Sequence, residues 1–256
     1  MSSLIGKVVF ITGASSGIGA ACARVFAGQG AVLVLTARRH ARLTTLASEL
    51  SAKYQTRCFS GELDVRQQPQ VEQFVNNLPP EFASIDILIN NAGLSRGLDP
   101  LFDGELEDWE EMLDTNVKGL LYVTKAILPG MLVRQSGHII NIGSIAGRQV
   151  YPSGNVYCAS KFAVRALTQG LLIDLVNTPI RVTEVDPGMV ETEFSLVRFR
   201  GDAERAAQTY RGLTPLKPND IAEVVLFAAT RPAYVNISEV VVLPTDQASV
   251  YHANRK

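Results

Sequence analysis

Short apolar runs alternate along the chain with amphipathic stretches. The runs cover residues 7–12, 31–37, 57–65, 85–93, 138–144, 180–188 and 239–244. Several of them have no polar face, which is typical of strands in a parallel sheet that carries helices on both sides. Helical spacing of apolar residues appears between the runs, in 17–29, 39–53, 68–78, 105–133, 155–177 and 219–230. We therefore predict that strands and helices alternate along the chain.

This alternation predicts the fold class. Strand and helix in turn require crossover connections, which build a parallel sheet from right-handed units. The expected fold is α/β: one doubly wound domain over residues 1–256, with a seven-stranded parallel sheet and helices on both faces. The stretch 189–217 contains no convincing strand. Because it is long for a loop in a compact domain, we expect it to be a lid or a binding segment.

Composition narrows the class of function. The 24 basic and 25 acidic residues give a formal net charge of −1, without long runs of one sign, so a nucleic-acid or membrane-surface partner is not expected. No apolar stretch approaches the roughly 18 residues of a membrane helix. The N-terminus lacks the features of a secretion signal, so a cytoplasmic protein is expected. The three cysteines are scattered without CxxC spacing, so neither disulfides nor a metal site are expected.

A glycine-rich turn follows the first predicted strand. The segment TGASSGIG (12–19) opens the first helix, which is the position that a dinucleotide site requires. Glycines there permit a tight turn, close approach of the backbone to a phosphate, and packing of the helix on the sheet. The helix N-terminus adds free N–H groups and a partial positive charge. We expect this turn to bind a nucleotide phosphate through Gly13, Ser15, Ser16, Gly17, Ile18 and Gly19.

The end of the second predicted strand indicates which dinucleotide binds. An acidic residue there would accept hydrogen bonds from the ribose 2′-hydroxyl of NAD, but the segment reads LTARRHARL. Arg38 and Arg39 stand in its place, and a guanidinium can meet a 2′-phosphate with paired, charge-assisted hydrogen bonds. A solvated basic start of the next helix is the alternative. The expected cofactor is NADP(H).

Tyr157 and Lys161 are four residues apart in a predicted helix, with Ser144 thirteen residues upstream of the tyrosine. Residues at this spacing share a helix face. A phenol with a pKa of about 10 is a poor base at neutral pH. An ammonium about 5 Å away would favour the phenolate by about 3 kcal/mol at an effective dielectric constant near 20. We interpret the pair as an acid–base unit, against the alternative of a chance pairing on a helix surface.

These motifs together resemble the short-chain dehydrogenase/reductase family. The TGxxxGxG turn, NNAG (90–93), Asn116, Ser144, YCASK (157–161) and DPG (186–188) occur in the family's order and cover essentially the whole chain. The resemblance implies a Rossmann-type fold and hydride transfer between a nicotinamide and a carbonyl or alcohol. It also implies that Tyr157 is the acid–base group and that Ser144 hydrogen-bonds the reacting oxygen.

Further roles follow from the same resemblance. Lys161 would bind the nicotinamide ribose hydroxyls, and Asn116 would belong to a water relay that leads to Lys161. Tyr157 would also contact the cofactor. The remaining positions lie at carboxyl ends of predicted strands, where open α/β sheets bind ligands. They are Asp64 and Val65 at the adenine, Asn91, Ala92 and Gly93 against the cofactor, and Pro187, Gly188, Val190 and Thr192 at the nicotinamide carboxamide.

Other stretches carry a narrower resemblance. IDILINNAGL, GHIINIGSIAG, TEFSLVRFRGD and LPTDQAS are similar to segments of the NADP-dependent 3-hydroxy acid dehydrogenases. This implies oxidation of serine, allo-threonine and related short 3-hydroxy acids, reduction of malonic semialdehyde, and a homotetramer. The alternatives are a broad-specificity carbonyl reductase and a 3-oxoacyl thioester reductase, although the latter commonly has a DGG-like end where this chain has VVVLPTDQAS. A non-catalytic NADP-sensing protein is a more distant alternative.

A small carboxylate substrate needs a cation or backbone donors near the reacting carbon. The expected lid carries Arg198 and Arg200, and we predict that one of them contacts the carboxylate when the segment closes. Arg148 and Gln149 follow Ser144 closely and are further candidates. A solvated basic helix is the alternative for each arginine.

Overall fold

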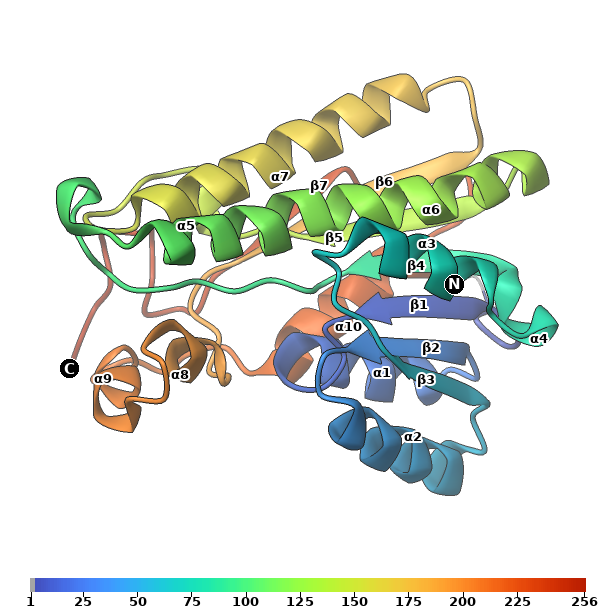
Figure 1. Ribbon diagram of the computed structural model, residues 1–256, viewed down its shortest axis with the longest axis horizontal. Helices are drawn as coiled ribbons and strands as arrows, with labels where there is room; N and C mark the ends of the chain where they lie inside the picture. The colour runs from blue at the N-terminus through green and yellow to red at the C-terminus, as the bar shows by residue number, and fades with distance from the viewer. Residues whose placement is uncertain (1–2) are drawn as a thin grey trace.

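The computed structural model describes residues 3–256, and in this range seven parallel strands form one sheet in the order β3-β2-β1-β4-β5-β6-β7 (Figure 1). The strands are β1 (Val8–Thr12), β2 (Val32–Ala37), β3 (Cys58–Glu62), β4 (Ile85–Asn90), β5 (Gly137–Ile142), β6 (Ile180–Pro187) and β7 (Glu239–Val242). The predicted doubly wound sheet is confirmed. Strand order reverses between β1 and β4, and ligands of such sheets bind at the carboxyl ends beside this reversal.

Helices cover both faces of the sheet. They are α1 (Gly17–Ala27), α2 (His40–Tyr54), α3 (Gln68–Asn76), α4 (Pro80–Ala83), α5 (Leu106–Leu113), α6 (Gly119–Arg134), α7 (Asn155–Asp174), α8 (Phe194–Arg198), α9 (Ala203–Gln208) and α10 (Pro218–Ala229). Figure 1 shows α6 and α7 running side by side on one face, whereas α1, α2 and α10 lie toward the other. The layers are those that the alternating pattern predicts.

The core lies in two layers, one on each side of the sheet. All five residues of β1 are buried, and they point alternately into the two layers. Val9 and Ile11 pack with apolar residues of α1, α2 and α10. Val8 and Phe10 pack with those of α3 and α6. Within residues 3–256, no helix is both long enough and apolar enough to cross a membrane.

The predicted helix over 105–133 is interrupted in the structure. A π-helical turn over Asp114–Lys118 separates α5 from α6, and it buries Thr115 and Asn116. Single π turns inside helices occur frequently at functional sites. The apolar periodicity continues across the turn, so the sequence pattern did not reveal the break.

The expected lid contains α8 and α9. Its two ends are joined by backbone hydrogen bonds, from the N–H of Leu216 to Met189 at 2.9 Å and from the N–H of Glu191 to Leu216 at 2.8 Å. These bonds close the segment into a loop that leaves the sheet after β6 and returns before α10. Gly201 within it has φ +95°, a backbone conformation that glycine adopts readily.

Candidate active site

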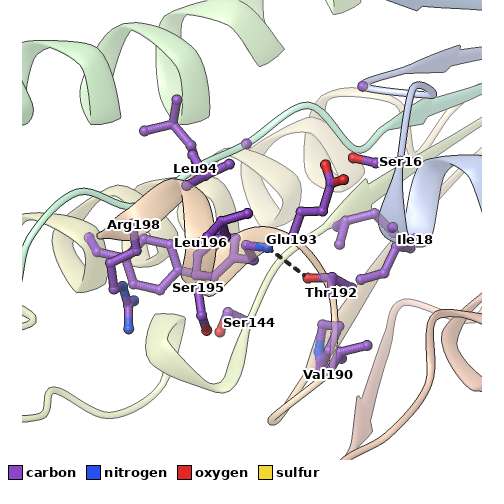
Figure 2. A pocket seen from close by; sticks show the side chains of 18 of the residues that line it. Ser16, Ile18, Leu94, Ser144, Val190, Thr192, Glu193, Ser195, Leu196 and Arg198 are labelled. Carbon is purple, nitrogen blue, oxygen red and sulfur yellow. Dashed lines mark hydrogen bonds between the residues drawn. The ribbon is translucent and has the colours of Figure 1, made fainter. Parts of the chain in front are cut away.

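A pocket of about 900 Å³ lies at the carboxyl ends of the strands, and residues of segment 189–217, the expected lid, form part of its lining. Figure 2 shows Ser16 and Ile18 at one end and Arg198 at the other, with Ser144 and Glu193 between them. The residues expected to hold the cofactor line this pocket, with the exception of Gly19. Topology therefore gathers segments from the whole length of the chain at one edge of the sheet.

The glycine turn approaches the end of β4 closely. Gly13 and Gly17 have φ values of +65° and +55°, which favour glycine. A Cβ on Gly13 would lie 2.9 Å from the Cα of Ala92. Asn91 donates from Nδ2 to the carbonyl oxygens of Thr12 and Gly13, at 2.9 and 3.2 Å, and so fixes the turn to β4.

The N-terminus of α1 is open toward the pocket. Its first residue, Gly17, lines the pocket. Ser16 is the N-cap residue, and within residues 3–256 its side chain makes no capping hydrogen bond to the helix. The first N–H groups of a helix lack intrahelical partners and attract anions. Gly19 lies behind the lining, where a Cβ would meet Asn91 Nδ2 at 2.5 Å. The turn thus fits a pyrophosphate.

Arg39 extends along the glycine turn. Its Nη2 donates to the hydroxyl oxygens of Ser15 and Ser16 at 3.1 and 2.7 Å, and its Nε donates to Ser15 at 3.2 Å. Arg38 also lines the pocket and pairs with Glu111 at 3.4 Å. Two guanidinium groups beside hydroxyl donors match the chemistry of a phosphate monoester, so the residues present fit a 2′-phosphate.

Ser144 is held in place by β6. Asp186 accepts the backbone N–H of Ser144 at 3.0 Å, and the Oγ of Ser144 accepts the N–H of Ala146 at 3.1 Å. Because the Oγ already accepts one hydrogen bond, its proton is left to donate. Ser144 therefore presents a donor to the pocket beside Tyr157.

The surroundings of Tyr157 favour its protonated form. Burial raises the pKa of Tyr157 well above its usual value, the neighbouring Tyr151 raises it further, and Arg198 opposes the shift. The four-residue spacing predicts that Lys161 lowers this pKa. In the structure, loss of solvation by the phenolate is the larger effect. The phenol is accordingly in the state that donates a proton.

Lys161 lies one helical turn beyond Tyr157 and is buried. Its Nζ donates to the carbonyl oxygen of Ile142 at 2.9 Å. Burial lowers the pKa of Lys161 to about 8, although Asp186 and Glu184 oppose the shift. The ammonium is thus held at the floor of the pocket, at the end of β5.

Asn116 lies outside the pocket lining, in the π turn. Its Oδ1 accepts the N–H of Leu94 at 2.8 Å, and its Nδ2 donates to the carbonyl of Leu94 at 2.8 Å and to Ser160 at 3.0 Å. The amide therefore joins the loop after β4 to α7. A Cβ on Gly93 would approach Asn116 Oδ1 at 3.2 Å and Lys161 Nζ at 3.7 Å, so the expected relay partners lie near each other.

Arg198 reaches the pocket from α8 and is only 9% exposed. Its guanidinium lies 5.4 Å from the ring centroid of Tyr157, and Nη2 donates to the hydroxyl of Tyr151 at 2.8 Å. Its buried Nε has no hydrogen-bond partner in the part of the chain that the structure describes. Arg200 lines the same pocket but is paired with Asp108.

Arg148 and Gln149 do not line the pocket that residues 3–256 form. Arg148 turns toward β6 and β7, where it pairs with Asp186 and Glu239, each at 2.7 Å. Gln149 accepts the N–H of Val250 at 3.3 Å. Arg198 and Arg200, which do line the pocket, remain the candidates for a substrate anion.

Some pocket residues were not expected from sequence: Tyr151, Phe194 and Glu193. The ring of Phe194 meets that of Tyr157 in an edge-on contact at 5.6 Å. Tyr151 and Phe194 are aromatic residues close in sequence to Ser144 and Thr192, and this proximity was a usable signal. Glu193 follows Thr192 directly and shared this signal, but its partners could not be predicted, because they are arginines more than a hundred residues away.

Comparisons with known proteins agree with this geometry. Residues 7–201 match the family described as short chain dehydrogenase. An NADP-dependent 3-hydroxy acid dehydrogenase of Salmonella typhi is 48% identical over 94% of this chain and 96% of its own. Sulfoacetaldehyde reductase 2 of Chromohalobacter salexigens is 47% identical over 94% and 95%.

Among solved structures, a closed form of serine dehydrogenase complexed with NADP⁺ superimposes with a TM-score of 0.90. It is 45% identical and covers 95% of this chain and 97% of its own. The family match, the strand order and near-complete coverage all agree. This chain belongs to the short-chain dehydrogenase/reductase family.

Proposed function

We propose that this protein is an NADP(H)-dependent oxidoreductase that interconverts a short 3-hydroxy acid with its 3-oxo acid or semialdehyde. The observation that carries the proposal is the position of Arg198. This buried cation lies over Tyr157 and has an unpaired Nε within the described part of the chain. A pocket that places a guanidinium beside a proton donor suits an alcohol or carbonyl substrate that carries an anionic group. The similar 3-hydroxy acid dehydrogenase and serine dehydrogenase support this choice.

The side chains supply the proton chemistry. When bound, NADP(H) supplies or accepts the hydride at the reacting carbon. The Ser144 hydroxyl hydrogen-bonds the substrate oxygen, and Tyr157 gives its proton to that oxygen in reduction and removes it in oxidation. Burial raises the pKa of Tyr157, so the phenol holds the proton that reduction requires. Lys161 is the cation one turn away that favours the phenolate during oxidation.

The anion at Arg198 is proposed to be a carboxylate. A guanidinium also binds a sulfonate through its planar set of donors, and one similar protein is a sulfoacetaldehyde reductase. The carboxylate is favoured by the lid sequence TEFSLVRFRGD, which resembles that of the 3-hydroxy acid dehydrogenases. Arg200 is the second candidate, but its pairing with Asp108 occupies it.

The test is nicotinamide absorbance with purified protein. NADP⁺ and NAD⁺ would each be supplied with L-serine, D-serine, L-allo-threonine, 3-hydroxyisobutyrate and 3-hydroxypropionate, beside isethionate and neutral alcohols. We expect turnover that prefers NADP⁺ and the 3-hydroxy acids. Turnover confined to neutral alcohols would indicate a broad carbonyl reductase. Cofactor binding without turnover on any substrate would indicate a sensing protein.

We also propose that the enzyme is a cytoplasmic homotetramer. The family resemblance supports this assembly, and so do exposed apolar side chains: Leu113, Leu121 and Phe162 on α5, α6 and α7 are about 40% exposed. Light scattering coupled to size-exclusion chromatography tests the assembly, and a mass of one or two chains would contradict it. Cell fractionation tests the location.

A further inference from the structure

Glu193 bridges the lid and the cofactor end of the pocket. Its carboxylate accepts from Nη1 of Arg39 at 2.8 Å and from Nη1 of Arg42 at 2.7 and 2.8 Å. These arginines belong to the loop after β2 and to α2, whereas Glu193 lies immediately before α8. Figure 2 shows the carboxylate of Glu193 directed toward Ser16 and the glycine turn.

Arg39 is thereby shared between two kinds of acceptor. Its Nη1 serves Glu193, while Nε and Nη2 serve the hydroxyl oxygens of Ser15 and Ser16. A 2′-phosphate would need the same guanidinium, and it carries close to two negative charges and three acceptor oxygens. The carboxylate carries one charge and two acceptors, so the phosphate is the stronger partner for the same donors.

We propose that Glu193 is an internal competitor of the 2′-phosphate for Arg39 and Arg42, and that this competition makes the lid respond to which cofactor is bound. The proposal rests on the proposed function, since it needs Arg39 to receive the phosphate. Binding of a 2′-phosphate displaces Glu193 from the arginines and releases the start of α8. A cofactor without that phosphate leaves the contact in place.

The contact between Glu193 and the two arginines is close in sequence to residues at the Tyr157 end of the pocket. Glu193 directly precedes Phe194, whose ring packs against Tyr157 with centroids 5.6 Å apart. Thr192, on the other side, accepts the N–H of Phe194 at 3.1 Å. Arg198 lies at the other end of the same short helix. Release of Glu193 therefore loosens the helix that covers Tyr157 and carries the proposed anion site.

The competition has a direct thermodynamic test with fragments of the cofactor. Calorimetry would measure binding of 2′,5′-ADP, which carries the 2′-phosphate, and of 5′-AMP, which lacks it. Glu193 makes two exposed ion pairs, one with Arg39 and one with Arg42. Loss of an exposed ion pair changes an affinity a few-fold at most. We expect Glu193→Gln to bind 2′,5′-ADP about 3- to 10-fold more tightly than the unmodified protein and 5′-AMP equally well.

Glu191→Gln is the matched control. Glu191 is also in the lid and loses the same charge, but it pairs with Lys217 rather than with the arginines. We expect it to change neither affinity, which separates direct competition from a general loss of negative charge. Unchanged or weaker binding of 2′,5′-ADP by Glu193→Gln would overturn the proposal, and so would equal gains in both variants.

Hydrogen exchange tests the link to the lid. 2′,5′-ADP has no nicotinamide, so any effect on α8 must pass through the adenosine end of the site. We expect this fragment to speed amide exchange in residues 192–199 of the unmodified protein, and 5′-AMP to leave it unchanged. Glu193→Gln should exchange quickly without ligand and respond to neither fragment. No acceleration by 2′,5′-ADP in the unmodified protein would overturn the link.

Binding of 2′,5′-ADP to Arg38→Ala and Arg39→Ala distinguishes an error in the proposed NADP site from an error in the proposed competition by Glu193. If Arg38→Ala and Arg39→Ala both bind 2′,5′-ADP as well as the unmodified protein does, the proposed NADP site is wrong. If Arg39→Ala weakens binding while Glu193→Gln leaves it unchanged, the NADP site stands and the competition by Glu193 is wrong.

Discussion

The guanidinium of Arg198 lies 5.4 Å from the ring centroid of Tyr157, so the segment 189–217 brings a cation against the proposed proton donor. The same guanidinium lies 5.2 Å from the ring of Phe194 and bonds to Tyr151. Three aromatic rings thus hold a charged group whose Nε lacks a partner in the described residues. Packing of this kind fixes a long side chain before a substrate arrives, which lowers the entropy cost of binding.

Arg198→Ala should weaken use of 3-hydroxy acids. Hydrogen bonds to charged groups contribute about 1.5–3 kcal/mol, so we expect kcat/KM for the hydroxy acid to fall roughly 10- to 100-fold. Neutral alcohols should be affected little. Steady-state kinetics on both substrate classes measures the ratio, and an unchanged ratio would contradict a carboxylate contact.

Arg205→Ala is the control for this substitution. Arg205 belongs to the same segment 189–217, stacks on Phe199 at 4.5 Å and does not line the pocket formed by the described residues. Its removal should leave the ratio unchanged. Arg198→Lys should retain only part of the kcat/KM for 3-hydroxy acids, because an ammonium keeps the charge of the guanidinium but lacks its paired donors.

Tyr157→Phe should abolish turnover without preventing cofactor binding. Positioned general acids and bases contribute about 100- to 10,000-fold, and phenylalanine keeps the ring that packs on Phe194. Kinetics and NADPH fluorescence measure the two effects separately. Tyr234→Phe, at a side chain that is 91% exposed, is the matched control. Activity within a few-fold of the unmodified enzyme would move the acid–base role to another group.

Asp186→Asn should lower kcat through Ser144. Asp186 accepts the backbone N–H of Ser144 at 3.0 Å. An amide oxygen in its place is an uncharged, weaker acceptor, and the ion pair with Arg148 that orients this side chain is lost, so we expect kcat to fall about 10-fold with little change in KM. A double-mutant cycle distinguishes positioning from general destabilisation. In a Ser144→Ala background, Asp186→Asn should cost little more. Full additivity of the two effects would show that Asp186 does not act through Ser144.

Glu184 should make the stability of the protein fall as pH rises. Burial and the adjacent Asp186 raise the pKa of Glu184 from 4.5 to about 8. Glu239 also disfavours its ionisation, and Lys161 opposes this. Because the folded state binds the extra proton, the stabilisation is complete below pH 4.5 and is lost progressively as pH rises to about 8.

Glu184→Gln removes this titration while keeping the shape of the protonated acid. We expect its melting temperature, relative to the unmodified protein, to rise between pH 5 and pH 8. Calorimetry across that range measures the difference. A constant difference across this range would mean that Glu184 is already ionised at pH 5.

Local patterns predicted much of this protein. The apolar runs specified a parallel sheet, because strands buried on both faces have no polar side to show. The glycine turn and the four-residue spacing of Tyr157 and Lys161 depend on backbone geometry over a few residues, which sequence displays directly. The expected cofactor residues accordingly gather at one sheet edge.

Tertiary structure decided which charged groups face the pocket. Arg148 is four residues from Ser144, yet it turns away to pair with Asp186 and Glu239. Arg198 is far away in sequence, yet it lies over Tyr157. Such pairings depend on which distant segments come into contact in the folded chain. Local sequence periodicity does not show these contacts.

The protonation states were decided in the same way. Spacing alone suggested that Lys161 lowers the pKa of Tyr157, whereas burial raises it in the folded chain. The sequence by itself determined the sheet, the phosphate turn and the order of the reactive groups, because these depend on neighbours in the chain. Only the tertiary structure decided the burial and the long-range ion pairs, because solvation and charge depend on neighbours in space.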